Sequence, residues 1–179
     1  MTEHPEFSRP VECAALATGP VKERIEATEA ERAALARRFG LVALPELQAE
    51  VTLTPAAAGQ VRLDARLEAR VVQACVVTLE PVEAEIDESF TVYYAESAPQ
   101  PAGTVDLPVD DESWPEPIVA GRIDIGEAVA QQLALSLDPY PRAPGARFEG
   151  DYAATAEEAA AQTNPFAALA RERGSRRGH

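Results

Sequence analysis

Few residues in this sequence have the types and spacing that catalysis requires. The two histidines, His4 and His179, lie within a few residues of the chain ends, where a general base is hard to hold rigidly. Glu83, Glu85 and Asp87 alternate as on one face of a strand, which favours a solvated face over a matched acid and base. The chain also has no Gly-x-Ser-x-Gly, phosphate-binding glycine loop or His-Glu-x-x-His motif. We therefore predict that the protein is not an enzyme and takes no small-molecule substrate.

The two cysteines do not form a metal-binding pattern. Zinc usually takes four nitrogen or sulfur ligands in two close pairs, whereas Cys13 and Cys75 are 62 residues apart with no histidine near either. Between Ala74 and Val76, Cys75 is typical of a small buried apolar residue. A redox or hydrolytic role would need Cys75 to be exposed with a lowered pKa, and no basic residue lies close to it in sequence. We predict no metal and no cofactor; whether either cysteine is reactive stays open.

The charge of the chain indicates what it attracts. With 30 acidic and 16 basic side chains, the net charge of −14 favours basic proteins or metal ions over nucleic acid at long range, and it also aids solubility. Arg62, Arg66 and Arg70 alternate with Asp64 and Glu68 on one predicted face, so pairing within the sheet neutralises most of this basic ladder. The candidate RNA contacts are therefore the C-terminal arginines, Arg171, Arg173, Arg176 and Arg177.

Capping signals place three helices in the chain. They predict helices within residues 28–40 and 124–139, with Thr28 and Asp124 as N-caps, each followed three residues later by a glutamate, Glu31 and Glu127. A third, alanine-rich helix is predicted over 155–164, before a proline. Since these helices flank consecutive strands without βαβ alternation, we expect them to pack against a sheet.

Period-two patterns place the strands. Apolar and polar residues alternate over 46–53 and 61–71, which predicts a hairpin through the loop at 54–59. Further strands are predicted at 75–79 and 82–94, and residues 1–20 read as an edge strand or an arm. The fold class that follows is α+β, with a mainly antiparallel β-sheet or a partly closed barrel flanked by about three helices.

The chain reads as one domain with two mobile segments. We predict a single domain over 1–170, interrupted at 95–117 by a flexible, acidic, proline-rich excursion that Trp114 anchors. Residues 171–179 are expected to form a disordered basic tail. Neither a long apolar run nor a signal-peptide pattern is visible, so we expect a cytoplasmic location and no membrane partner.

Three stretches in order carry a resemblance to a known family. The first contains Val72, Gln73 and Cys75 and runs to residue 94; the second contains Asp124 and Glu127 and ends at residue 139. The third is the segment Asn164, Pro165 and Phe166. Together, over about residues 45–171, they resemble the YceD family, the "large ribosomal RNA subunit accumulation" proteins of bacteria and plastids.

The chain departs from the family pattern at its cysteines. Many members have a Cys-x-x-Cys pair and often further cysteines after the second helix, which implies a metal site in those members. Here Val72 stands at the first position of the pair, only Cys75 remains, and residues 139–152 contain no cysteine. The chain is therefore similar to the alphaproteobacterial branch and is expected to lack the metal.

The resemblance implies a non-enzymatic factor in large-subunit ribosomal RNA accumulation and large ribosomal subunit biogenesis. Two modes are open: the arginine tail and one sheet face bind precursor RNA, or the acidic body and its 106–116 loop shield a basic ribosomal protein. The net charge favours the second mode slightly. The alternative function is an acidic protein–protein adaptor in the cytoplasm without RNA contact. The Asn164-Pro165-Phe166 segment is either a cap that packs onto the body or a partner-binding element.

Overall fold

The computed structural model describes residues 5–96 and 115–147. The chain divides into two units, Met1–Pro144 and Gly145–His179, and every described helix and strand belongs to the first. The predicted third helix, Trp114, the Asn164-Pro165-Phe166 segment and the arginine tail lie outside the described residues. One domain over 1–170 therefore stays a prediction, as does the flexibility of the 95–117 excursion.

The described part of the chain begins with short strands and helices, continues with three long strands and ends with two short strands and a helix. In chain order they are β1 (Pro10–Glu12), a 3₁₀ helix (Cys13–Thr18), β2 (Val21–Glu26), α1 (Glu29–Phe39), β3 (Ala43–Pro55), a 3₁₀ turn (Ala57–Gly59), β4 (Val61–Ala74), β5 (Pro81–Ala95), β6 (Glu116–Pro117), β7 (Arg122–Asp124) and α2 (Ile125–Ser136).

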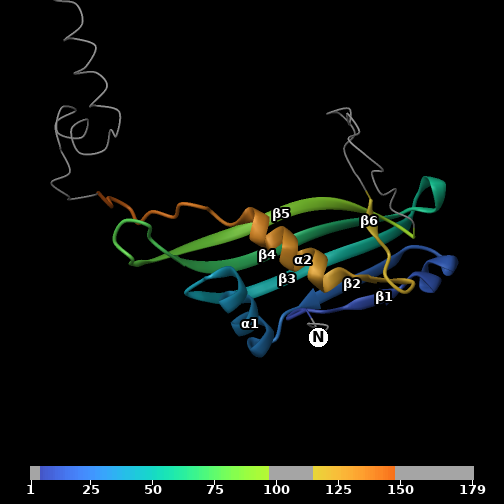
Figure 1. Cartoon of the computed structure of the whole chain (residues 1–179), viewed down its shortest axis with the longest axis horizontal. Helices are drawn as coiled ribbons and strands as arrows, with labels where there is room; N and C mark the ends of the chain where they lie inside the picture. Colours follow the sequence, from blue (N-terminus) through green and yellow to red (C-terminus); the bar gives the residue numbers. More distant parts are fainter. Residues whose placement is uncertain (1–4, 97–114, 148–179) are drawn as a thin grey trace, which may run out of the picture. The chain divides into compact units, whose positions relative to one another are not determined.

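The main sheet has five strands in the order β2-β3-β4-β5-β6 (Figure 1). β2 to β5 are antiparallel neighbours, and β6 adds two residues in parallel at one end of β5. A second, two-stranded sheet pairs β1 with β7. The predicted α+β class with a mainly antiparallel sheet and about three helices is confirmed, and the sheet is open rather than closed into a barrel.

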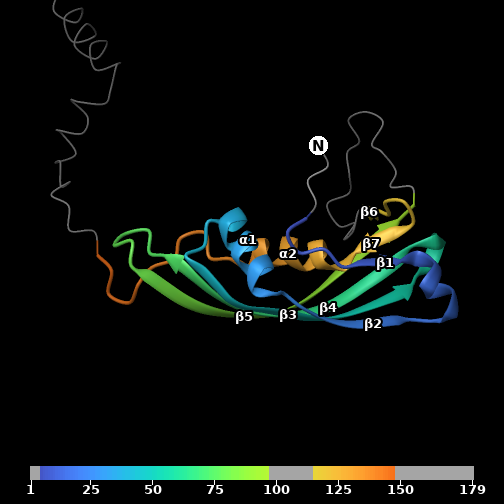
Figure 2. The ribbon, with the colours of Figure 1, turned by 90° about the horizontal axis from the view of Figure 1, so that it is seen from below.

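The core lies between one face of the sheet and the two α-helices, which cover the same face (Figure 2). Because strand side chains alternate, the odd-numbered residues of 47–53 in β3 and of 61–71 in β4 are buried, and the even-numbered ones between them point to the opposite, polar face. The fully buried side chains of the strands and helices include Leu35, Leu47, Leu63, Leu67 and Leu133. We call the polar side of the sheet the outer face.

The two predicted helices that lie within the described residues, α1 and α2, begin at the predicted caps. Thr28 and Glu31 form the capping box of α1, and Gly40 ends that helix in the left-handed conformation. The carboxylate of Asp124 accepts hydrogen bonds from the first backbone N–H groups of α2. No described helix has the length and apolar composition that crossing a bilayer requires.

The strand predicted at 75–79 is wrong, because the chain reverses there between β4 and β5. The Cys75 N–H donates to the Glu80 carbonyl, and the Leu79 N–H donates to the Cys75 carbonyl, which closes a tight turn. Leu79 adopts a left-handed φ of 63° within it. Since this conformation normally calls for glycine or asparagine, the apolar run gave no turn signal.

The N-terminal segment is more ordered than its sequence indicates. Phe7 is fully buried, and β1 pairs with β7 at an edge, as one of the two readings of residues 1–20 predicted. The edge strand β2 was not predicted. Its sequence, Val-Lys-Glu-Arg-Ile-Glu, is mostly charged, so it shows little of the apolar alternation of a half-buried strand.

Candidate functional site

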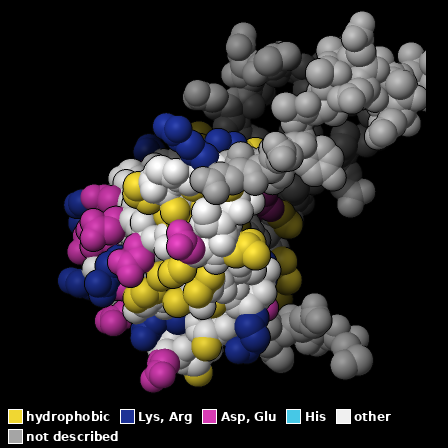
Figure 3. Space-filling view, turned by 90° about the vertical axis from the view of Figure 1, so that its left-hand side faces the viewer, with side chains coloured by type: hydrophobic (Ala, Val, Ile, Leu, Met, Phe, Trp, Pro, Cys, Tyr) yellow, Lys and Arg dark blue, Asp and Glu magenta, His cyan; other side chains and the backbone are white. Residues whose placement is uncertain are grey.

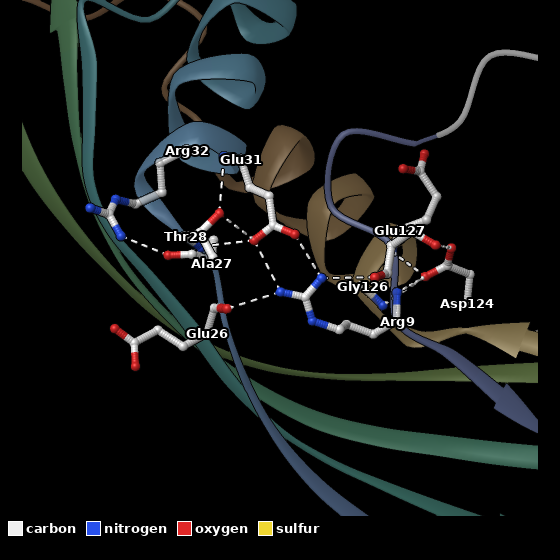
Figure 4. A network of polar contacts seen from close by, with 10 residues as sticks. Arg9, Glu26, Ala27, Thr28, Glu31, Arg32, Asp124, Gly126 and Glu127 are labelled. Carbon is white, nitrogen blue, oxygen red and sulfur yellow. Dashed lines mark hydrogen bonds and ion pairs between the residues drawn. The ribbon is translucent and has the colours of Figure 1, made fainter.

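Asp124 joins the N-terminal segment to the start of α2 (Figure 4). One carboxylate oxygen accepts the backbone N–H groups of Arg9 at 2.7 Å, Gly126 at 3.1 Å and Glu127 at 3.2 Å. The other accepts the Ser8 hydroxyl. A carboxylate with four donors from this chain is a structural cap, and its charge also suits the positive end of the helix dipole.

Arg9 extends this contact to the other helix. Its guanidinium makes a two-pronged ion pair with Glu31 at 2.7 and 3.0 Å, donates to the Glu26 carbonyl and lies over the Phe7 ring. The Arg9 hydrogen bond lowers the pKa of Glu31 to about 2, because it stabilises the charged carboxylate. Glu31 also receives the Thr28 N–H, so one side chain caps α1 and holds the N-terminal segment.

Arg38 and Glu127 connect the helices directly. The Arg38 guanidinium donates to both carboxylate oxygens of Glu127, at 2.8 and 2.9 Å, and to Glu6 at 3.0 Å. The bond to Glu127 raises the pKa of Arg38 above its ordinary value. The family-motif positions Asp124 and Glu127 therefore both bind groups of this chain. We call the set Arg9, Glu31, Arg38, Asp124 and Glu127 the helix clamp.

Gly126 permits the close approach that the clamp needs. A Cβ atom at this position would lie 2.5 Å from the Phe7 carbonyl oxygen and 3.0 Å from the Arg9 nitrogen. Both contacts involve backbone atoms, so no side-chain rotation relieves them. The N-terminal segment can therefore pass over the first turn of α2 only because residue 126 has no side chain.

Cys75 lies away from the helix clamp, in the turn between β4 and β5. Its side chain is fully buried, as predicted, and its sulfur accepts the N–H groups of Val77 and Thr78 at 3.4 Å and of Ala143 at 3.3 Å. Hydrogen bonding from the Thr78 side chain, followed by the backbone donors, lowers the pKa of Cys75 to about 6. Sequence reasoning looked for a basic neighbour and so missed donors supplied by the backbone.

The surroundings of Cys75 do not fit a metal ion. The groups that face the sulfur are hydrogen-bond donors, which do not coordinate a cation. Within residues 5–96 and 115–147, no group of three or more His, Cys, Asp or Glu side chains is arranged to hold one. Of the two conditions for a reactive thiol, the lowered pKa is met and exposure is not.

The other family-motif residues near Cys75 lie on β4. Val72 pairs with Glu83 across the β4–β5 ladder, and the Gln73 side chain donates to the Asp138 carbonyl beyond α2. Thr78, which follows Cys75 with two residues between them, lies in the same turn, and its backbone N–H donates to the Cys75 sulfur. A second cysteine beside this sulfur would therefore stand at position 78 rather than at 72.

The outer face of the sheet carries a ladder of paired charges, as the sequence predicted for its arginines. All three β4 arginines have carboxylate partners: Arg62 with Asp64 at 2.7 Å, Arg66 with Asp87 at 2.7 Å and Glu68 at 3.5 Å, and Arg70 with Glu46 at 2.9 Å. These arginines are exposed, yet their charge is compensated within the sheet. They offer little net positive charge to phosphate groups.

The acidic side chains of β5 are less compensated. Glu83 and Glu85 are exposed, and neither has an ion-pair partner among the described residues; Asp87 pairs with Arg66. Residues 71–121 of the sequence contain eleven acidic and no basic side chains. Figure 3 looks onto the end of the molecule at the left of Figure 1 and shows acidic and basic side chains gathered along one side, with apolar side chains beside them. We call Glu83, Glu85 and Asp87 the acidic edge.

A comparison with protein families finds one matching family model. The family model described as "Large ribosomal RNA subunit accumulation protein YceD" matches residues 63–171, more than half of the chain. The chain belongs to the YceD family. The match includes the Cys75 turn, the acidic edge, and Asp124 and Glu127 at the start of α2. No curated protein and no solved structure matches the chain.

The structure brings together residues that the sequence kept apart. Arg9 and Arg38 did not stand out in the sequence, because their partners are 22 and 89 residues away. The local signals of this cluster were the capping box at Thr28 and Glu31 and the cap at Asp124 with Glu127 three residues later. The predicted partner contacts Asn164, Pro165, Phe166, Arg171, Arg173, Arg176 and Arg177 lie outside the described residues.

Proposed function

We propose that this member of the YceD family is a non-enzymatic cytoplasmic factor that supports large ribosomal subunit biogenesis by shielding a strongly basic ribosomal protein. The family description supports the link to large-subunit ribosomal RNA accumulation. The charge of the described body supports the kind of partner: residues 5–96 and 115–147 hold 20 acidic and 12 basic side chains. Such a surface attracts a cationic protein and repels RNA at long range.

The acidic edge is the observation that carries this proposal. Its carboxylates are exposed, and those of Glu83 and Glu85 form no ion pair among the described residues, although Glu85 lies across from Arg70, which pairs with Glu46. The carboxylates of the helix clamp, in contrast, bind groups of this chain. A surface that binds a cationic partner requires negative charge that is not used in ion pairs within the chain. Exposed carboxylates provide this charge at little cost in the stability of the fold.

Precursor RNA is the second candidate partner, through the arginine tail. The β4 arginines favour it little, since carboxylates neutralise them. Arg171, Arg173, Arg176 and Arg177 could each neutralise a phosphate. Deleting residues 171–179 separates the two modes: shielding predicts that the shortened protein still associates with large-subunit precursors, whereas complete loss of association would favour RNA binding by the tail.

Sedimentation of the tagged full-length protein tests the function itself. Lysates are fractionated on sucrose gradients with and without RNase, and fractions are probed for the protein and for large-subunit precursor RNA. The proposal predicts co-migration with immature large particles, together with a light complex that resists RNase and dissociates in high salt. Migration only as free protein, even at low salt, would contradict it. An RNase-resistant complex without any ribosomal component would favour the adaptor.

A further inference from the structure

We propose that the outer edge of β5 is a strand-docking site for an extended, Lys/Arg-rich segment of the partner protein. The docked segment adds to the main sheet by backbone hydrogen bonds, and its basic side chains pair with the acidic edge. This inference rests on the proposed function, because it specifies how the basic protein is held. It is carried by the free backbone of β5 and by the charges on that strand.

β5 has one paired edge and one open edge. Its inner edge pairs with β4 along the whole strand, from Pro81 opposite Ala74 to Tyr94 opposite Val61. Its outer edge pairs only at Tyr94 and Ala95, with β6. Over 81–93, no described residue takes up the outward backbone groups. Thirteen residues of strand span about 40 Å at roughly 3.3 Å per residue, which is long enough for a complete added strand.

The outward backbone groups of β5 belong to its odd-numbered residues. The Ala95 carbonyl accepts the Ile118 N–H at 2.9 Å, so the backbone groups of Ala95 face the outer edge. Both polar groups of a strand residue point to the same edge, and this direction alternates along the strand. The β4–β5 register is continuous, so the alternation is not broken by a bulge. Glu83, Glu85 and Asp87 therefore offer outward N–H and C=O groups to an added strand.

These same residues place their side chains on the outer face. Glu85 and Asp87 lie opposite Arg70 and Glu68 of β4, whose side chains are on that face. Whichever direction an added strand runs, every second side chain lies on the outer face beside the acidic edge. The geometry therefore selects a segment with basic residues at alternate positions. Neighbouring opposite charges across strands stabilise the pairing, whereas like charges oppose it.

Glu83 and Glu85 carry the charge that is available to such a segment. Asp87 pairs with Arg66, and Glu88 lies on the other face, where Gln132 and Ser136 donate to it. No basic side chain occurs within β5. An uncharged strand, or one with acidic side chains, would gain no counter-charge here, which makes the edge selective for cationic segments.

Peptide binding to the full-length protein tests the charge requirement. The probe is a 12-residue peptide that alternates lysine with threonine; the control peptide has the same composition with its lysines in one block. We expect the alternating peptide to bind at least tenfold more tightly. The variant Glu83→Lys/Glu85→Lys should weaken it at least tenfold. The matched variant Glu26→Lys/Glu50→Lys makes the same charge change on the outer face near the other edge, and should change the affinity less than threefold.

Amide hydrogen exchange tests the strand itself. In the free protein, the amides of Glu85, Asp87 and Ser89 should exchange fast, because they face the open edge, while the even-numbered amides that face β4 should be protected. The alternating peptide should slow the odd-numbered amides at least tenfold. Ser89→Pro removes one outward donor without touching the β4 ladder and should weaken binding at least fivefold while the fold, checked by the even-numbered amides, is retained.

Equal affinity for the two peptides, or binding without new protection at odd-numbered amides, would overturn strand docking. The outcome for the proposed function is read separately, from sedimentation. If Glu83→Lys/Glu85→Lys and Ser89→Pro proteins still co-migrate with large-subunit precursors as wild type does, the edge is not the docking site and the function stands. If wild type does not co-migrate at all, the proposed function fails independently of any peptide result.

Discussion

The acidic residues of this protein occupy two contrasting regions. In the helix clamp, Glu31, Asp124 and Glu127 are half-buried, and each binds donors from distant parts of the same chain. At the acidic edge, Glu83 and Glu85 are exposed beside an open strand and bind nothing described. The clamp uses its charge to fix β1, α1 and α2 together. The edge leaves Glu83 and Glu85 exposed and without an ion pair among the described residues, so the same side-chain types hold the fold in one region and face solvent in the other.

The difference shows why the family motif alone does not locate a binding site. Asp124 and Glu127 belong to the part of the sequence that resembles the family, yet in this structure both are committed to the clamp. The acidic edge has no motif beyond alternating carboxylates. Substitutions at the clamp should therefore act on stability, and those at the edge on association.

Asp124→Ala should have the largest effect on stability. It removes a helix cap and leaves the Arg9 and Glu127 N–H groups without their acceptor, for a loss of about 3 kcal/mol in the free energy of unfolding. Urea denaturation measures it. Asp138→Ala, which removes a single acceptor for the exposed Tyr140 N–H, should cost less than about 1 kcal/mol. Equal effects of the two variants would contradict a special role of Asp124.

Gly126→Ala should come next, with a loss of about 2 kcal/mol from overpacking against the Phe7 carbonyl. Helix propensity alone predicts the opposite sign, since alanine stabilises a helix by up to about 1 kcal/mol over glycine. The sign of the change in the thermal unfolding midpoint therefore decides whether the Phe7 backbone lies close to residue 126. A gain in stability would show that the N-terminal segment does not lie over α2 in solution.

Glu31→Gln should cost about 1 kcal/mol near pH 7, because it breaks the ion pair with the partly exposed Arg9. The pKa of Glu31 is lowered from 4.5 to about 2 in the folded protein, so its contribution is present above pH 4.5 and is lost as the pH falls toward 2. The stability difference between wild type and variant, measured from pH 7 to pH 2, should shrink over that window. Glu29 lies in the same helical turn but has no ion pair among the described residues. The stability difference between wild type and Glu29→Gln should therefore not change over this pH range.

Glu83→Lys/Glu85→Lys should have the smallest effect on stability, within about 0.5 kcal/mol of wild type. The two side chains are exposed and have no described ion-pair partner, so their replacement breaks no ion pair within the described residues. A lysine at position 85 would face Arg70 across the strands, but both side chains are exposed and Glu46 pairs with Arg70, so the repulsion is small. Thermal unfolding of the purified variant measures it. A loss above about 2 kcal/mol would mean that these carboxylates support the fold, and the contrast with the clamp would disappear.

The sequence predicted those parts of the fold that depend on neighbouring residues. The capping box at Thr28, the cap at Asp124 and the long β3–β4 hairpin are local patterns, and all three are confirmed. β2 was missed because it is mostly charged, and the turn at Cys75 was taken for a strand because Leu79 stands where glycine would be expected. In both cases tertiary pairing overrides the local pattern.

The candidate site was only partly predictable. Glu83, Glu85 and Asp87 were correctly placed on one exposed strand face from their spacing. That β5 lies at an open edge depends on sheet order, which period-two alternation does not encode. The partners of Arg9 and Arg38 and the donors to the Cys75 sulfur likewise come from distant or backbone groups, so no sequence spacing could reveal them.

Complementation in living cells tests the central claim most directly. In cells that lack the gene, the ratio of large- to small-subunit ribosomal RNA is measured after restoring wild type, Glu83→Lys/Glu85→Lys or Glu26→Lys/Glu50→Lys, each at equal protein level. The account predicts that wild type and the Glu26/Glu50 variant restore the ratio, whereas the Glu83/Glu85 variant, although folded, does not. Full restoration by the Glu83/Glu85 variant would contradict a functional role for the acidic edge.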